Sequence, residues 1–298
     1  MSLLDFATHY FSAPWVLLLL ASVYCSIGVL FIGFRAQGYR PKVRSRVLLA
    51  IFGLASSSWI FIASSLVFCQ VFKSLYYSDE GSAIVTVLGF STLSTLVLGL
   101  PISLIMATKL PSLVVRRLER DLVAPSASLS RLIGSMASTL GVERVALYES
   151  TAGTPSAYSL GGPKNIVVIS TSLEESLDKD ELETVLMHEL AHLSNKDTQI
   201  NAIVHVYRKM LFFDPLIRLI EKAIHKEREF ACDEVSAKLT RKPLALASAL
   251  IKIHSRVSQT EKPAFLAGSI ILLGRNTLRE RIERLVRISQ ELEHQKGQ

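Results

Sequence analysis

Three long runs of residues without a charged side chain constrain the fold of this chain most. They cover about 13–34, 47–72 and 83–107. Each run is long enough to cross a hydrocarbon layer of about 30 Å as a helix, because a helix rises about 1.5 Å per residue. We therefore expect a transmembrane region of three helices in residues 1–107. Of all residues 49% are hydrophobic while 20% are charged, which is typical of membrane spans joined to a polar domain.

The basic residues around these runs predict the topology. The first loop carries no acid and five basic residues: Arg35, Arg40, Lys42, Arg44 and Arg46. Four more follow the third run: Lys109, Arg116, Arg117 and Arg120. Since basic residues favour the inner face, we expect a multi-pass protein of the cell membrane whose residues after 107 lie in the cytoplasm. The net charge of +7 favours contact with the anionic lipid bilayer, and no motif indicates nucleic-acid binding.

The remainder of the chain predicts a mainly α fold with a small β-sheet (α+β). We expect an amphipathic linker over 108–125 and one domain over 126–298. In that domain, a helix near 126–140 precedes strands at 142–148 and 165–170. The second strand could be an edge strand that pairs with an extended peptide, or a plain structural strand. Residues 198–224 are too charged to span lipid, and Pro215 should divide them into two helices.

One helix carries the pattern H-E-x-x-H at His188, Glu189 and His192. Asp178 and Glu181 have the spacing of a helix N-cap and its reciprocal partner, so we expect the helix to begin there. Residues four apart lie on the same helical face, so the two histidines can bind one metal ion. Zinc prefers nitrogen ligands in a tetrahedral set, and a catalytic zinc keeps one position for water. Glu189 lies beside the proposed ion, where it could reach that water.

The third ligand should come from the acidic segment 226–234. Glu229 and Asp233 are four residues apart, so one could bind zinc while the other accepts a hydrogen bond from a liganding histidine. Glu227 and Glu234 fall on other helical faces and are expected in solvent or in salt bridges. Cys232 is expected to be a small buried hydrophobic residue.

These motifs resemble membrane-bound zinc metallopeptidases. His188-Glu-Leu-Ala-His192 followed by Arg228-Glu-Phe-Ala-Cys-Asp233 is similar to the HtpX-type and CAAX-type group, family M48, and to the β-lactam sensor-transducer group, family M56. The resemblance implies a zincin fold of the gluzincin type and one Zn²⁺ per chain. It also implies that His188, His192 and Glu229 bind zinc and that Glu189 is the catalytic base, which leaves Asp233 to orient a histidine.

Two further stretches carry the resemblance. Thr154-Pro-Ser-Ala-Tyr-Ser-Leu-Gly-Gly162 resembles the "P-N-A-F-A-x-G" turn of HtpX-type enzymes, with Ser156 in place of asparagine. That turn implies substrate contacts by Ser156, Ala157 and Tyr158. The helix 276–285 resembles the closing "P-x-x-x-R-I-x-x-L" helix of the same group, without its prolines.

We therefore expect an integral-membrane zinc endopeptidase in which Glu189 activates a zinc-bound water to hydrolyse peptide bonds. Its expected substrates are unfolded or membrane proteins, and its expected role is membrane-protein quality control. One alternative is a signalling protease that cleaves a cytosolic repressor. The outer loop 73–82 is small for a receptor and no sensor domain is evident before Gln298, which favours quality control. A CAAX-type protease and a non-catalytic membrane scaffold are the remaining alternatives.

Overall fold

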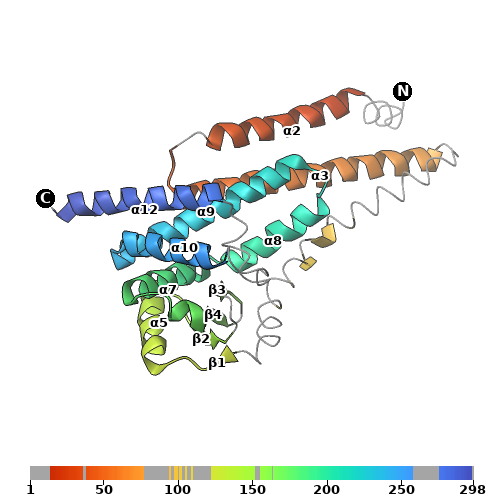
Figure 1. Cartoon of the computed structure of the whole chain (residues 1–298). Helices are drawn as coiled ribbons and strands as arrows, with labels where there is room; N and C mark the ends of the chain where they lie inside the picture. The colour runs from red at the N-terminus through yellow and green to blue at the C-terminus, as the bar shows by residue number, and fades with distance from the viewer. Residues whose placement is uncertain are drawn as a thin grey trace. The chain divides into compact units, whose positions relative to one another are not determined.

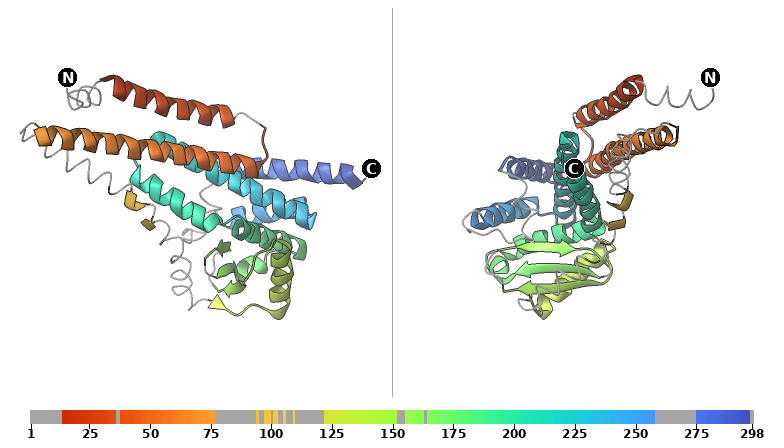
Figure 2. Two further views of the ribbon diagram at one scale, coloured as in Figure 1. Left: turned by 180° about the vertical axis from the view of Figure 1, so that it is seen from behind. Right: turned by 90° about the vertical axis from the view of Figure 1, so that its right-hand side faces the viewer.

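The computed structural model divides into two compact units. Figure 1 labels its helices and strands, and Figure 2 gives two further views of them. It describes scattered residues between 94 and 109 and the ranges 14–35, 38–76, 122–151, 155–162, 164–257 and 275–296. The first unit contains 1–104 and 203–225, and the second contains 105–202 and 226–298. The expected domain over 126–298 stays a prediction; in the division into units, 203–225 falls in the first unit.

The first unit is helical. Helix α2 (Pro14–Arg35) and helix α3 (Pro41–Tyr76) contain the first two apolar runs. By the length and hydropathy of the residues that the structure describes, none of the helices could cross a membrane. The third run and the amphipathic segment 108–125 lie mostly outside the described residues, so the three spans and their topology stay predictions.

The unit also contains most of α8 (Asp197–Met210) and the start of α9 (Pro215–Thr240). The expected break at Pro215 is confirmed, since Pro215 is the first residue of α9. Before it, the buried Asp214 accepts hydrogen bonds from the backbone N–H groups of Leu216 and Ile217. The indole of Trp59 on α3 donates to the same carboxylate at 2.7 Å. Asp214 therefore caps α9 and ties its start to α3.

The second unit contains a mixed four-stranded sheet in the order β1-β2-β4-β3. Its strands are β1 (Leu122–Val123), β2 (Val145–Ser150), β3 (Ala157–Leu160) and β4 (Asn165–Ser170). Of the two alternatives for 165–170, the structure supports the plain structural strand, because β4 pairs with β2 on one side and with β3 on the other. Five consecutive buried residues, 166–170, are typical of such an inner strand. The strands at the edges of this sheet are β1 and β3, and the sequence did not predict β3 as a strand.

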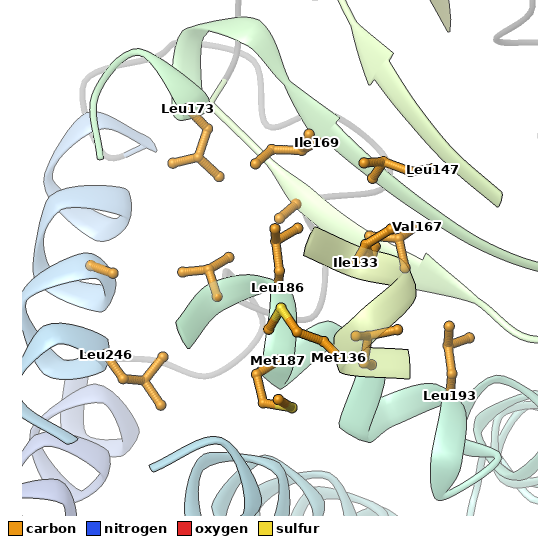
Figure 3. Close-up of a cluster of buried hydrophobic side chains, with 14 of the residues drawn as sticks. Ile133, Met136, Leu147, Val167, Ile169, Leu173, Leu186, Met187, Leu193 and Leu246 are labelled. Carbon is orange, nitrogen blue, oxygen red and sulfur yellow. The ribbon is translucent and has the colours of Figure 1, made fainter. Parts of the chain in front are cut away.

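Helices α5 (Ala127–Thr139) and α7 (Lys179–Ser194) cover one face of this sheet. Side chains alternate between the faces of a strand, and on this face Leu147, Val167 and Ile169 meet Ile133 of α5 and Leu186 of α7 (Figure 3). Helix α10 (Pro243–Val257) packs on α7 and α12 (Arg275–Lys296) packs on α10. The short α6 (Thr171–Glu174) follows β4.

Helix α7 is buried on several sides rather than along one apolar stripe. Ten of its sixteen residues are buried, among them His188 and Glu189. Its expected start is confirmed, because the side chains and backbone N–H groups of Asp178 and Glu181 form a capping box. Glu181 also accepts hydrogen bonds from Ser248 and Lys252 of α10. The same carboxylate thus caps α7 and joins it to α10.

Replacing Glu181 should therefore destabilise the chain. We expect Glu181→Ala to lower the free energy of unfolding by about 1–3 kcal/mol, because it leaves partners of a buried carboxylate unpaired. The matched control is Asp180→Ala on the same turn, whose surface ion pair with Lys242 should contribute less than about 1 kcal/mol. Thermal unfolding of the purified chain measures both, and equal losses would contradict this account.

The loss of unfolding free energy in Glu181→Ala should also depend on pH. Burial raises the pKa of Glu181, but hydrogen bonds from Lys252 and Ser248 bring it below its ordinary value. A carboxyl whose pKa is depressed by folding contributes stability above its unfolded pKa and loses that contribution as the pH falls. The difference between wild type and Glu181→Ala is therefore expected to shrink below about pH 4.

Candidate metal centre

The structure brings His188, His192 and Glu229 together within the second unit. The two Nε2 atoms lie 3.1 Å apart, although the residues are on successive turns of α7. The Glu229 carboxylate, from α9, lies 3.6 Å from Nε2 of His188 and 3.5 Å from Nε2 of His192. Among the described residues, these three form a group whose potential ligand atoms all lie within 4.8 Å of one another.

These separations fit a tetrahedral zinc ion. Ligand atoms at about 2.0–2.1 Å from a tetrahedral ion lie about 3.3 Å from each other, close to the observed 3.1–3.6 Å. His188 and Glu229 are buried, whereas the His192 side chain keeps 15% exposure. The candidate ligands are therefore largely shielded from solvent, and His192 is the most exposed of the three.

Both histidines are oriented by carboxylates at their other ring nitrogen. Nδ1 of His188 lies 3.0 Å from Asp233, as expected for the residue that orients a liganding histidine. Nδ1 of His192 contacts Asp197, a residue that the sequence did not suggest to us. Because a carboxylate only accepts hydrogen bonds, a neutral ring beside one carries its proton on Nδ1 and presents the lone pair of Nε2. His192 makes this hydrogen bond to Asp197, whereas Nδ1 of His188 approaches Asp233 without hydrogen-bond geometry. Two lone pairs and the Glu229 carboxylate therefore converge on one point, which a cation would satisfy.

A sharp turn after α7 places Asp197 beside His192. Helix α7 ends at Ser194 with Asn195 as its C-cap, and Lys196 adopts a left-handed backbone conformation with φ of 55°. Its N–H bonds the carbonyl of Leu193, which closes the helix in the manner usually served by glycine. Helix α8 then begins at Asp197, whose carboxylate also pairs with the buried Arg228.

Arg281 of α12 neutralises the carboxylates of α9. Its guanidinium binds both oxygens of Asp233 at 2.7 Å and lies 3.0 Å from Glu229. All three side chains are at most 7% exposed. Our reading of 276–285 as a closing helix did not assign Arg281 a partner, because the contact joins residues 48 positions apart.

The charges around the ligands shift their titration. Burial raises the pKa of Glu229, but Arg281 and the two histidines bring it well below its ordinary value. Burial lowers the pKa of His188, but Asp233 and Glu229 outweigh burial and raise it. The surroundings thus favour an ionised carboxylate and a positive charge among the ligands, which is the electrostatic environment of a cation site.

Glu189 is buried and is held by a serine. It is 6% exposed, and its Oε2 accepts a hydrogen bond of 2.8 Å from the hydroxyl of Ser159 on β3. Burial lowers the pKa of His192, but Cys232, Glu229 and Glu189 together outweigh burial and raise it. Sequence reasoning missed Ser159, although it lies in the turn motif that we had singled out.

The expected substrate-contacting residues lie at the start of β3. Ser156, Ala157 and Tyr158 are each at most 9% exposed. The N–H of Ser156 donates to the hydroxyl of Ser170, and its carbonyl accepts from the N–H of Ser170. Their contact with a substrate stays a prediction, and any such contact would have to use the free edge of the strand rather than these buried side chains.

The acidic segment 226–234 agrees with expectation only in part. Glu234 forms an ion pair with Lys238 as expected, but Glu227 is 4% exposed and does not lie in solvent. Cys232 is fully buried as expected, but its sulfur lies 3.3 Å from Nδ1 of His192 and 3.7 Å from Asp197, so it forms part of the wall of the site. Helix α9 is buried on more than one face, which simple helical spacing did not reveal.

Removing the Arg281 charge should disrupt this centre. Arg281→Met leaves two buried carboxylates uncompensated, so we expect a loss of about 3–5 kcal/mol in unfolding free energy together with weaker zinc binding. The control is Arg279→Met on the same helix, where the side chain is 81% exposed and pairs with Glu283. Its expected cost is below about 1 kcal/mol. Similar melting temperatures for the two variants would show that the buried charge network does not stabilise the fold.

The chain is similar to known proteases. A protease HtpX homolog from Paenarthrobacter aurescens is 38% identical over 39% of this chain and 51% of that protein. A protease HtpX homolog from Methanopyrus kandleri is 29% identical over 55% of this chain and 68% of that protein. The chain thus spans about half to two thirds of the length of these relatives.

A structural comparison gives a weaker similarity. The crystal structure of S. mikatae Ste24p aligns with 96% of this chain at 15% identity and a TM-score of 0.39, a level that establishes no shared fold.

The family described as BlaR1 peptidase M56 matches residues 94–285, a range that contains both histidines, Glu189, Glu229 and Arg281. The chain therefore belongs to the M56 peptidase family and is similar to the HtpX-type proteases.

Proposed function

We propose that this protein is a zinc-dependent endopeptidase. The observation that carries the proposal is the convergence of His188, His192 and Glu229 on one point. The buried Glu189, which follows His188 on the same helix, is the candidate base. In a non-catalytic scaffold without a metal ion, gathering these acceptor atoms in the interior would only cost stability. The family match and the similarity to HtpX homologs support the same activity.

The residues of the chain divide the chemistry among them. His188, His192 and Glu229 would hold the zinc ion, while Asp233 and Asp197 fix the two imidazole rings. When bound, zinc supplies Lewis acidity, which polarises a peptide carbonyl and lowers the pKa of water to about 7. Glu189 takes the proton from the attacking water and returns it to the departing amine.

We propose that the enzyme works at the cytoplasmic face of the cell membrane. The apolar runs within 1–107 and the basic residues beside them support this location. Its substrates would be unfolded or membrane proteins, consistent with a role in membrane-protein quality control. The similarity to protease HtpX homologs supports the peptidase activity that this role requires.

A second role has a specific observation in its favour. The matching family is described by BlaR1, which belongs to the sensor-transducer group. In that role the same hydrolysis would cleave a cytosolic repressor. Mass spectrometry of proteins captured by an inactive variant separates the roles, since quality control predicts many membrane proteins and signalling predicts one soluble regulator.

The catalytic assignment is tested by Glu189→Gln. The amide cannot accept the proton from water, so we expect hydrolysis of an unfolded casein to fall by at least about 100-fold while the zinc content stays at one ion per chain. Glu183→Gln, the same substitution on a solvent-facing turn of α7, is the control and should retain activity. Proteolysis retained by Glu189→Gln would refute the assignment.

The metal assignment is tested by Glu229→Ala and Glu229→Gln. Each removes one of three protein ligands, so zinc affinity should fall by at least about 100-fold. Zinc per chain after dialysis against a competing chelator provides the measurement. Glu234→Ala, on an exposed part of the same helix beside Lys238, should bind zinc like the wild type. If both Glu229 variants keep full zinc, Glu229 is not a ligand.

A further inference from the structure

We propose that Ser159 is a positioning residue for Glu189: its hydroxyl fixes the carboxylate in the orientation that proton transfer requires. The inference rests on the proposed peptidase function and adds to it a residue that no sequence motif assigned. The hydrogen bond from Ser159 Oγ to Glu189 Oε2 is 2.8 Å long and joins residues 30 positions apart. Its two ends come from the edge strand of the sheet and from the ligand helix.

The sheet directs Ser159 toward α7. Side chains two residues apart lie on the same face of a strand, so Ser159 shares a face with Ala157. Ala157 belongs to the core between the sheet and α7, whereas Tyr158 packs with Ile166 and Val168 on the opposite face. In register, Ser159 lies opposite Val167, which is fully buried in the same core. The pleat of β3 therefore leaves Ser159 facing α7 rather than solvent.

A fixed carboxylate suits a general base. Glutamate has three side-chain torsions, and an unrestrained carboxylate would sample several orientations. A carboxylate that is held through one oxygen keeps the other oxygen free to take a proton. Since a misplacement of about 1 Å can cost about 100-fold in rate, restraining Glu189 by a bond from the rigid sheet has kinetic value. The low exposure of Glu189, 6%, means that bulk water offers little competition for this bond.

The hydroxyl is a property of this chain rather than of the motif around it. The HtpX-type turn "P-N-A-F-A-x-G" has alanine at the position that Ser159 occupies here. Alanine cannot donate a hydrogen bond, so the packing of this position against α7 does not require the hydroxyl. Serine at this position adds a hydrogen-bond donor that alanine lacks.

The test compares Ser159→Ala with two other variants in the full chain. Ser159→Ala should leave zinc content unchanged and lower kcat on unfolded casein by about 10- to 100-fold, with KM within about threefold and the chain still folded at the assay temperature. Ser159→Thr keeps the hydroxyl and should retain kcat within about threefold of the wild type. Ser176→Ala is the matched control, since the Ser176 hydroxyl is also half-buried and donates a 2.8 Å bond, but to the backbone carbonyl of Leu173.

A second measurement, carbon-13 NMR, does not depend on enzymatic activity. In metal-free protein labelled with carbon-13 at the glutamate carboxyl groups, the Glu189 resonance is identified as the one that disappears in Glu189→Gln. We expect Ser159→Ala to shift this signal and Ser176→Ala to leave it unchanged. An unshifted signal, or a normal kcat in Ser159→Ala, would overturn the inference. If Glu189→Gln stays active, the proposed function fails instead, and the two failures are thereby distinguished.

Discussion

The centre of this structure is a set of buried charges that must neutralise one another. Glu229, Asp233 and Asp197 bring three carboxylates around two imidazoles, and each of these acids is at most 5% exposed. Isolated ions in such surroundings would cost several kcal/mol each. Arg281 and Arg228 supply compensating charge, and the histidines link the two halves of the network. A divalent cation at the Nε2 atoms would complete that balance.

The layers of the second unit hold this charged set in place. Helix α7 packs against the sheet through Leu186 and against α10 through its other faces, so His188 and Glu189 have little freedom to move. The carboxylate of Glu181 joins α7 to α10 at the start of the helix. The left-handed Lys196 ends α7 and presents Asp197 at the other end. The apolar packing and the polar site therefore depend on the same helix.

Local patterns in the sequence predicted some of these features and missed others. The ligand helix, its cap at Asp178 and the break at Pro215 follow from short-range spacing, so the sequence was sufficient for them. The order of β3 and β4 and the contacts of Ser159 and Arg281 join residues distant in the chain, and no local rule encodes such pairs. Cys232 shows a related limit, because spacing along one helix does not reveal which neighbouring helix it faces.

The contact between Arg281 and the carboxylates of α9 also bears on the order of biosynthesis. Because the chain is made from its N-terminus, the H-E-x-x-H helix leaves the ribosome almost ninety residues before Arg281 does. Until α12 has been translated and has docked, Asp233 and Glu229 lack their guanidinium partner. The buried charges of the site are therefore balanced only after α12 has been translated and has packed beside α9.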